Sequence, residues 1–418
     1  MVVFRRIRRV IAVPPFWLYL MTISAWFFGF GLQTTLFPGV INYTLMESPD
    51  KLGLAQAALT APMLVLLPLT GVIAERYDRR ILLAGFHTLA ALAALSLFTL
   101  MSFGLLSYEM LVAYALCVGI AGAFVMPARD SAINPVIRVS QRLNQNGRSL
   151  QKGVIIASLV QFAAQILGMG LGFGASFSGP KYFFALQGVG LLLGGICALL
   201  LPRLPSRAVK TDKVLKSLKD GISTVWHSPI LGPMTLIMIV VGLLVIGGGF
   251  FVIIPVLVRD VYHSGYEVLA SLLVTFWVGA FAANVILARL GNIEKPGQAL
   301  IYSQIITIIA LGLFATPLPL WALYGLIFCW GLGAGVAISL SRAIVQENAP
   351  AGKLARVMSV YQLGLFGGAP AGAATFGYIV AHLGARQASL IPMIGLSLFM
   401  LGIALFSPLM KVTREEPA

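Results

Sequence analysis

Long apolar runs recur along the chain, and short polar stretches separate them. A helix needs roughly 20 mostly apolar residues to cross the hydrocarbon core of a bilayer. The first run is longer than a signal-peptide core, and no small-residue cleavage site follows the arginines before it, so we expect it to remain as a membrane span. The pattern predicts twelve spanning helices, at residues 16–40, 53–74, 81–103, 108–127, 150–174, 181–201, 232–258, 267–288, 298–316, 318–340, 357–381 and 387–408.

Composition supports this interpretation and excludes other classes of protein. Of the 418 residues, 59% are hydrophobic and only 10% are charged, and the mean hydropathy is +0.92. Soluble proteins carry about 25% charged residues, so a soluble enzyme, a secreted disulfide scaffold and a disordered chain are excluded. Cys117, Cys197 and Cys329 lie in apolar runs without the spacing of a metal site. We therefore expect no metal and no cofactor, and the sequence shows no catalytic Ser/His/Asp set or nucleotide-binding loop.

The basic residues predict the orientation of the spans. The net charge is +15, and 25 of the 29 lysines and arginines lie at the termini or in loops on one side. The other side holds Lys51, Lys181, Arg259 and Arg386. Because cytoplasmic loops are enriched in Lys and Arg, we expect both termini in the cytoplasm. This enrichment explains the charge without a nucleic-acid partner, and weak binding of anionic lipid headgroups is another use of these loops.

The longest internal loop, Pro202–Ser228, divides the spans into two groups of six. We therefore expect an N-terminal six-helix bundle (1–201), a cytoplasmic linker (202–228) and a C-terminal six-helix bundle (229–418). In the linker, apolar residues recur at helical spacing with lysines opposite them, which predicts an amphipathic helix on the inner membrane surface; a solvated linker is the alternative. The residues concerned are Leu215, Leu218, Ile222, Val225 and Trp226, with Lys210, Lys213, Lys216 and Lys219.

The two halves resemble each other in sequence. A shift of 213 residues aligns Gly71–Arg76 with Asn284–Arg289 and also aligns Gly122–Arg129 with Gly335–Arg342. Two groups of six helices related by a parallel repeat are typical of transporters, in which the substrate site lies near the membrane midplane between the halves.

The loop between the second and third spans carries a charged motif. Its elements are Gly71, Glu75, Arg76, Asp78, Arg79 and Arg80. It resembles the signature of the major facilitator superfamily. We expect Glu75 and Asp78 to pair with Arg76, Arg79 or Arg129, or to face a helix N-terminus, and so to act as a cytoplasmic gate. A basic loop that only sets topology is the alternative, and the second half lacks the acids because Ala288 and Gly291 replace them.

Two more segments, 119–129 and 349–372, resemble the branch of this superfamily that contains enterobactin exporters and macrolide-efflux proteins. The resemblance implies an all-α fold of twelve transmembrane helices in two pseudo-symmetric bundles, and efflux of amphiphilic molecules from the bacterial inner membrane as an antiporter coupled to protons. The chain departs from drug–proton antiporters in two places. Ala115 stands four residues before Gly119, where those proteins carry an arginine, and Gly168-Met-Gly-Leu-Gly172 replaces their Gly-Pro pair.

The acidic residues argue against a proton site in mid-membrane. All fourteen fall in predicted loops or at membrane edges, whereas intramembrane carboxylates are the usual proton relays. Glu109 and Asp130, expected at helix ends, are the nearest substitutes. His87 lies two turns into the third span, and we expect a hydrogen-bonded or lipid-edge histidine there rather than a proton carrier.

Neutral polar residues supply the candidate substrate cavity. Amides and hydroxyls inside spans should face the bundle interior because an unsatisfied polar group is costly in hydrocarbon. Hydrogen bonds that only join helices are the alternative. Trp26, Phe27, Phe28, Phe250 and Phe251 are candidates for apolar walls or for lipid-facing positions. The candidate cavity residues are Gln33, Thr34, Gln56, Gln161, Gln165, Asn284, Tyr361 and Gln362.

Two glycine-rich stretches predict interrupted helices. Gly247–Gly249 lies in the seventh span before Pro255, and Gly367–Gly368 lies in the eleventh span before Pro370. Interrupted helices mark hinges or binding segments in transporters, and close helix packing is the alternative.

These observations favour a monomeric secondary active transporter that works by alternating access and exports an amphiphilic small molecule, a siderophore or a hydrophobic drug. Protons and membrane lipids are its other expected partners. The second hypothesis is a transporter of lysophospholipid or another lipid through the same fold. A membrane receptor or scaffold that transports nothing is the third.

Overall fold

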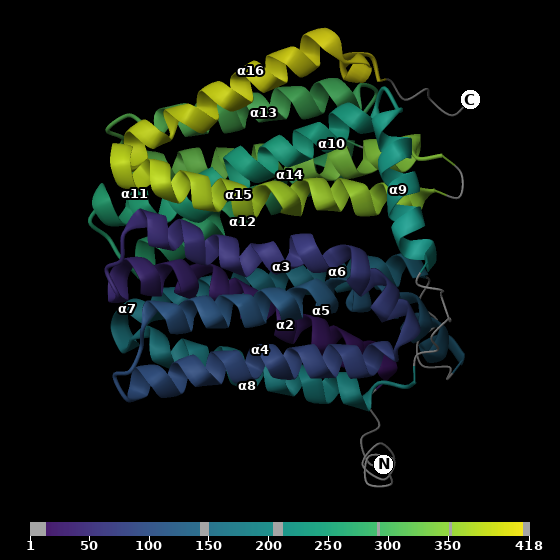
Figure 1. Cartoon of the computed structure of the whole chain (residues 1–418), viewed down its shortest axis with the longest axis horizontal. Helices are drawn as coiled ribbons and strands as arrows, with labels where there is room; N and C mark the ends of the chain where they lie inside the picture. Colours follow the sequence, from purple (N-terminus) through teal and green to yellow (C-terminus); the bar gives the residue numbers. More distant parts are fainter. Residues whose placement is uncertain (1–13, 143–149, 204–211, 291–292, 351–352, 413–418) are drawn as a thin grey trace. The chain divides into compact units, whose positions relative to one another are not determined.

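The computed structural model describes residues 14–142, 150–203, 212–290, 293–350 and 353–412, and these fold almost entirely into helices without a strand (Figure 1). The first half contains α2 (Pro15–Gly39), the π-helical turn η1 (Val40–Thr44), α3 (Pro49–Arg76), α4 (Arg79–Ser102), α5 (Tyr108–Arg142), α6 (Leu150–Leu171), η2 (Gly172–Gly174), α7 (Ala175–Ser178) and α8 (Pro180–Leu200). The second half contains α9 (Asp212–Trp226), α10 (Leu231–Val240), the π-helix η3 (Val241–Ile253), α11 (Ile254–Asp260), α12 (Tyr266–Leu290), α13 (Pro296–Leu313), α14 (Leu320–Asn348), α15 (Leu354–Ala388), α16 (Leu390–Phe406) and η4 (Pro408–Lys411).

The helices coincide with the predicted spans. Among the described residues, ten helical stretches are long and apolar enough to cross a membrane, and α16 is a shorter apolar helix. The remaining predicted span, 53–74, lies within α3. The chain is therefore an all-α membrane protein with twelve transmembrane helices, as the apolar pattern predicts.

The helices form two compact units. One comprises Met1–Phe37 and Val65–Val214, and the other comprises Pro38–Leu64 and Leu215–Ala418. Pro38–Leu64, which the sequence pattern assigns to the N-terminal bundle, belongs to the second unit. Both α2 and α3 therefore contribute to both units.

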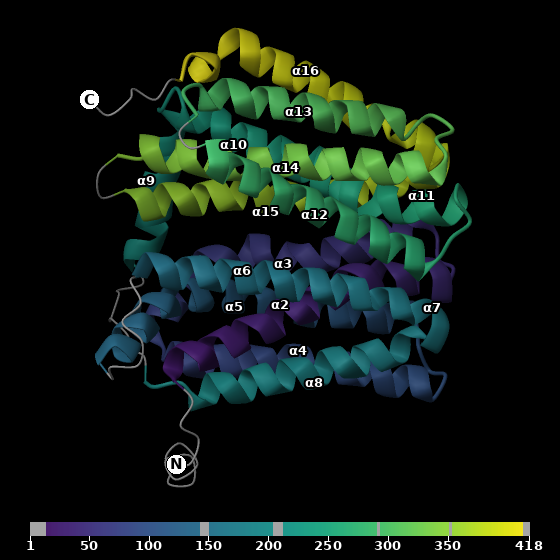
Figure 2. The same cartoon turned by 180° about the vertical axis from the view of Figure 1, so that it is seen from behind.

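Small residues let helices approach closely in the first unit. Helices α4 and α8 run side by side in both views (Figure 1, Figure 2). A Cβ atom on Gly188 of α8 would lie 3.1 Å from the carbonyl oxygen of Ala91, and one on Gly195 would lie 3.4 Å from that of Ala84. Backbones at such distances gain van der Waals contact that larger side chains would prevent.

The glycine-rich stretches of the second unit also serve close packing. The seventh span stays helical as α10, η3 and α11, and α15 passes through Gly367, Gly368 and Pro370 without a break. A Cβ on Gly247 would lie 2.7 Å from the backbone nitrogen of Ala373, and one on Gly368 would lie 2.6 Å from that of Leu243. The expected interruptions are therefore wrong for these glycines, except that η3 is a π-helix. The break in α15 lies at Gly384, where φ is 76°.

Helix α5 is longer than predicted. The sequence places the end of the fourth span near residue 127, but α5 continues through Pro127 and Pro135 to Arg142. Proline removes one backbone donor and favours a kink. Membrane helices tolerate it because neighbouring groups satisfy the freed carbonyl.

The linker contains the predicted helix, α9. Arg356 of α15 donates to Asp220 at 3.3 Å, and the Lys353 ammonium donates to the Thr224 hydroxyl at 3.1 Å. Ile222 and Trp226 are exposed. Lys210 lies outside the described residues, and the position of α9 on the membrane surface stays a prediction.

Candidate functional site

The charged motif surrounds the junction of α3 and α4. Asp78 caps the N-terminus of α4, where its carboxylate accepts from the Arg80 backbone N–H at 3.1 Å and pairs with the Arg80 guanidinium at 3.3 Å. Arg79 is buried, and its Nε donates to Ser131 Oγ of α5 at 3.0 Å. The described partner of Asp78 is thus Arg80 rather than Arg79 or Arg129, because a residue that caps a helix sits beside the first turn of that helix. The side chains of Gly71, Glu75 and Arg76 lie outside the described part.

Arg129 forms the other part of the motif and connects three helices. On α5, its guanidinium pairs with Asp130 at 2.6 Å and donates to Gln161 Oε1 of α6 at 3.0 Å. The same group lies 4.9 Å from the ring centroid of Phe27 on α2, and the hydroxyl of Tyr19 donates to the Arg129 carbonyl at 3.1 Å. Of the predicted gating and cavity residues in the first unit, the structure brings Arg129 and Gln161 together.

The other candidate amides of the first unit are buried. Gln33 and Gln165 are each 3% exposed, and the Thr34 hydroxyl donates to the carbonyl of Phe30 at 2.8 Å. In the part of the chain that the structure describes, Gln165 Nε2 meets no hydrogen-bond partner. The backbone of α6 at Gln165 packs against Gly31 of α2. Gln165 therefore places an unsatisfied donor inside a spanning helix.

The candidate cavity residues of the second unit lie on different helices. Gln56 of α3 is 4% exposed. Asn284 of α12 is exposed; its Nδ2 donates to the carbonyl of Ala280 and its Oδ1 accepts from Ser339 at 2.6 Å. Tyr361 of α15 is 5% exposed, and its hydroxyl lies 2.7 Å from the Ser341 hydroxyl. Gln362, its neighbour on α15, is half-buried.

The described carboxylates of the spanning helices lie in terminal turns, with the exception of Asp130. Glu109 is in the first turn of α5, as predicted. Asp130 lies inside α5 because the helix continues to Arg142, and its side chain is 60% exposed beside Arg129. His87 of α4 is fully buried, with Nδ1 2.7 Å from the Leu83 carbonyl and Nε2 3.2 Å from the Thr22 carbonyl. It is a hydrogen-bonded histidine, not one at the lipid edge.

The predicted apolar walls take part in aromatic packing. Phe250 of η3 contacts Phe276 of α12 with ring centroids 5.1 Å apart, and Phe276 lies 5.3 Å from Trp330 of α14. Trp330 is 1% exposed. In the first unit, Trp26 packs edge-on against His87 at 5.2 Å. Of the predicted wall residues, Trp26 and Phe27 are buried, whereas Phe28, Phe250 and Phe251 are half-buried.

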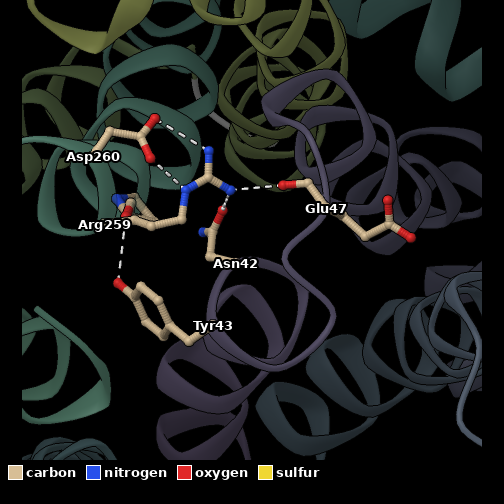
Figure 3. Close-up of polar contacts among 6 residues, drawn as sticks. Asn42, Tyr43, Glu47, Arg259 and Asp260 are labelled. Atoms are coloured by element: carbon tan, nitrogen blue, oxygen red, sulfur yellow. Dashed lines mark hydrogen bonds and ion pairs between the residues drawn. The ribbon is translucent and has the colours of Figure 1, made fainter. Parts of the chain in front are cut away.

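A polar cluster that the sequence does not single out lies where η1 meets α11 and α12 (Figure 3). We call it the Arg259 cluster; its members are Asn42, Tyr43, Thr44, Glu47, Arg259, Asp260 and Tyr266. Arg259, in the last turn of α11, donates through Nη1 to Asn42 Oδ1 at 3.1 Å and to the Glu47 carbonyl at 2.6 Å. Its Nε and Nη2 donate to the two carboxylate oxygens of Asp260 at 2.5 and 3.1 Å.

Two tyrosines extend the Arg259 cluster. The Tyr43 hydroxyl donates to the Pro255 carbonyl at 3.3 Å, and the Thr44 hydroxyl lies 2.8 Å from the Tyr266 hydroxyl. Asn42 is fully buried, and in the described structure its Nδ2 has no partner. The signal in the sequence was Arg259 itself, one of the four basic residues on the side that is otherwise poor in them.

Comparison with known proteins identifies the family of this chain. The family model described as Major Facilitator Superfamily matches residues 18–373. Among curated proteins, the enterobactin exporter EntS of Shigella flexneri is 24% identical over 376 residues, which cover 88% of this chain and 86% of the relative. The EntS protein of Escherichia coli O81 (strain ED1a) is similar to the same extent.

Solved structures agree in fold. The nucleoside transporter NupG superposes with a TM-score of 0.76 at 13% identity, over 94% of this chain and 99% of that one. A D-xylose–proton symporter gives a TM-score of 0.72 at 14% identity, over 95% and 98%. At 13–14% identity, the similarity to these structures establishes only the fold. The family model covers most of the sequence and therefore establishes the family. The chain is therefore a multi-pass membrane transporter, not an enzyme, and it belongs to the Major Facilitator Superfamily.

Proposed function

We propose that this transporter exports an amphiphilic small molecule, such as a siderophore or a hydrophobic drug, across the bacterial inner membrane by alternating access. The observation that carries the proposal is the set of buried, uncharged amides in spanning helices: Gln33, Gln56 and Gln165 are each less than 5% exposed. The relationship to enterobactin exporters over most of the chain supports the direction and the class of substrate.

The unsatisfied amide of Gln165 favours a substrate with hydrogen-bond acceptors. A buried donor without a partner costs about 1–3 kcal/mol. A ligand carbonyl, phenolate or ether oxygen that accepts from Nε2 would remove this cost, whereas a purely apolar ligand would not. An uncharged amide N–H can also donate to an anionic or neutral ligand, whereas a cation would need a buried counter-ion.

Proton coupling would have to use groups near helix ends. The carboxylates that the structure describes within spanning helices lie in terminal turns, apart from Asp130, and that group is exposed and paired with Arg129. We infer that Asp78 and Asp130 are the carboxylates whose protonation would change the cytoplasmic gate. In this proposal both termini lie in the cytoplasm, as the distribution of lysine and arginine indicates.

The test is transport in inverted membrane vesicles energised by respiration. A pH-sensitive dye reports whether a siderophore, a drug or a lysolipid dissipates the proton gradient, and labelled substrate reports uptake. We expect Gln161→Ala, Gln165→Ala and Gln362→Ala, combined in one chain, to reduce uptake at least tenfold. Gln298→Ala is the matched control, because this amide lies near the start of α13 and donates to the Met410 carbonyl. Unchanged transport of every substrate by the triple variant would refute the assignment of these amides.

A lipid transporter is the second candidate, because uncharged buried amides suit a lysophospholipid equally well. Labelled lysolipid that crosses without proton flux would favour it. Dissipation of the gradient by a drug or siderophore, lost on Asp78→Asn, would favour the exporter. A protein that moves none of these substrates would leave a receptor or scaffold role.

A further inference from the structure

Helix α16 has one buried face and one exposed face. It packs against α13 in the second unit (Figure 1, Figure 2). The buried face carries Pro392, Leu396, Met400 and Ile403. The exposed face carries a row of apolar side chains that are 37–67% exposed and stand three or four residues apart. They are Leu390, Ile394, Leu398, Leu401 and Leu405. Residues at this spacing share one side of a helix, and in a spanning helix such a row meets lipid tails.

Arg386 extends this row at the end opposite the basic loops. The break in α15 at Gly384 separates the last residues of that helix from the rest. A helical hydrogen bond then joins them to α16, because the Ser389 N–H donates to the Ala385 carbonyl at 3.2 Å. Arg386 therefore lies one helical turn before Leu390 and on the same side of the helix.

Arg386 differs from the other basic residues at this end of the spans. Only four are present there, where lysine and arginine are depleted. In the described structure, each of the other three lies beside a carboxylate or an aromatic ring; they are Lys51, Lys181 and Arg259. Arg386 pairs with no carboxylate among the described residues, and its Nε is buried without a hydrogen-bond partner. A partly desolvated cation gains more from an anionic partner than a cation in water does, so this position favours an anion from outside the chain.

The surroundings of Arg386 are neutral and lie at the level of lipid headgroups. Burial raises the pKa of the Tyr262 hydroxyl, and the nearby charge of Arg386 partly offsets that rise. The same hydroxyl donates to the Leu318 carbonyl at 2.9 Å, just before α14. Trp321, in the first turn of α14, is 78% exposed. Because exposed tryptophans are typical of the boundary between lipid tails and headgroups, we place the guanidinium at that boundary.

We propose that Arg386 binds the phosphate of an anionic phospholipid in the leaflet opposite the basic loops, and that the row from Leu390 to Leu405 receives one of its acyl chains. The two parts match a phospholipid, because a cation stands at one end of a continuous apolar face. Arginine is well suited to phosphate, with which it forms strong, charge-assisted hydrogen bonds. Since Arg386 pairs with no described carboxylate, nothing there favours the ammonium group of a zwitterionic headgroup. The expected ligand is therefore phosphatidylglycerol or another lipid of its charge.

The experiment measures lipid preference at this face. In a chain with Cys117, Cys197 and Cys329 changed to Ala, Ile394→Cys carries a bimane fluorophore on the exposed row, two helical turns from Arg386. The full chain is placed in phosphatidylcholine bilayers that contain a lipid with brominated acyl chains, which quenches the fluorophore on close contact. Quenching by brominated phosphatidylglycerol, compared with brominated phosphatidylcholine, gives the relative affinity of the two lipids for this face.

We expect phosphatidylglycerol to be preferred about fivefold, which is the effect of one basic side chain near an anionic lipid. Brominated phosphatidylethanolamine should behave like phosphatidylcholine. Arg386→Gln should abolish the preference, and Arg386→Lys should retain part of it because lysine keeps the charge. Lys181→Gln, which removes another cation at the same end of the spans, is the matched control and should leave the preference unchanged. A fluorophore on Leu92→Cys, on the exposed face of α4, should report the same quenching with and without Arg386.

Equal quenching by the two lipids in the chain with Arg386 would overturn the proposal, and so would a preference that survives in Arg386→Gln. Quenching by brominated phosphatidylcholine should be the same in every variant, which shows that the face is intact. If inorganic phosphate at constant ionic strength removed the preference, the guanidinium would bind free phosphate and the lipid assignment would fail. None of these outcomes depends on transport, so the proposed function stands or falls separately.

Discussion

Arg129 and Gln161 should be energetically coupled across α5 and α6. Arg129 belongs to the predicted gate and Gln161 to the predicted cavity, and the structure joins them by one hydrogen bond of 3.0 Å. The perturbation is a double-mutant cycle of Arg129→Ala, Gln161→Ala and the combined variant. If the bond matters, the second substitution should cost less once the first has been made.

The expected magnitude follows from the three contacts of the guanidinium. A hydrogen bond from a charged donor contributes about 1.5–3 kcal/mol, and the contact with Phe27 at 4.9 Å contributes about 0.5–2 kcal/mol. The pair with Asp130 contributes little, about 0–1 kcal/mol, because that carboxylate is 60% exposed. Only the first contact involves Gln161, so we expect a coupling free energy of about 1–2 kcal/mol.

The assay is unfolding in mixed micelles by increasing sodium dodecyl sulfate, followed by the loss of helical circular dichroism. Phe27→Leu serves as the control branch, since it removes the ring contact and should retain the coupling between Arg129 and Gln161. A coupling below about 0.3 kcal/mol, the usual limit of additivity, would refute the reasoning. Gln161 would then be available to a substrate without any effect on the gate.

Two further predictions concern the backbone. Gly372→Ala should lower the melting temperature by a few degrees, because the added Cβ would lie 2.8 Å from the carbonyl carbon of Leu243. Gly402 has open space around it, so Gly402→Ala should leave the melting temperature unchanged or raise it. Equal effects of the two substitutions would contradict the packing of α15 on η3. Met46→Gly should stabilise the protein by about 1 kcal/mol. A non-glycine residue with φ of 53° carries a cost of about 1–2 kcal/mol, and the Met46 side chain, 72% exposed, has little packing to lose. Unfolding in the same mixed micelles measures the change, and a loss of stability would contradict the strain assigned to Met46.

The apolar pattern could predict the spans because hydrocarbon imposes one requirement on every spanning segment. The same pattern could not predict the length of α5, because Pro127 is typical of a helix end. The helix continues to Arg142 because neighbouring helices can satisfy the backbone groups that the proline leaves without partners. In the sequence, the glycine-rich stretch at Gly247 is equally typical of a hinge and of a helix contact surface. The structure shows that it is a contact surface, because it packs against the backbone of α15, more than 120 residues away in sequence.

In the candidate site, too, some features follow from the sequence and others depend on how the helices pack. Burial of Gln33, Gln56 and Gln165 follows from placing a polar group in a span, and the sequence could predict it. The partner of Arg129 could not be predicted, because α5 and α6 have to be packed before Gln161 comes within reach. For the same reason, Arg259 stood out in the sequence only as an isolated charge, while its bond to Asn42 spans 217 residues.

Two of the charged side chains lie at helix ends, whereas two of the buried amides lie well inside their helices. Asp78 caps α4 and Arg259 ends α11, whereas Gln33 and Gln165 lie well inside α2 and α6. Rearranging charges near helix ends costs less than doing so in hydrocarbon, because water can solvate the separated groups. If gating works through these charges, their substitution should change the rate of opening for every substrate alike. Substitution of the amides should instead change which substrate is preferred, so the two kinds of variant would separate gating from recognition in a single transport assay.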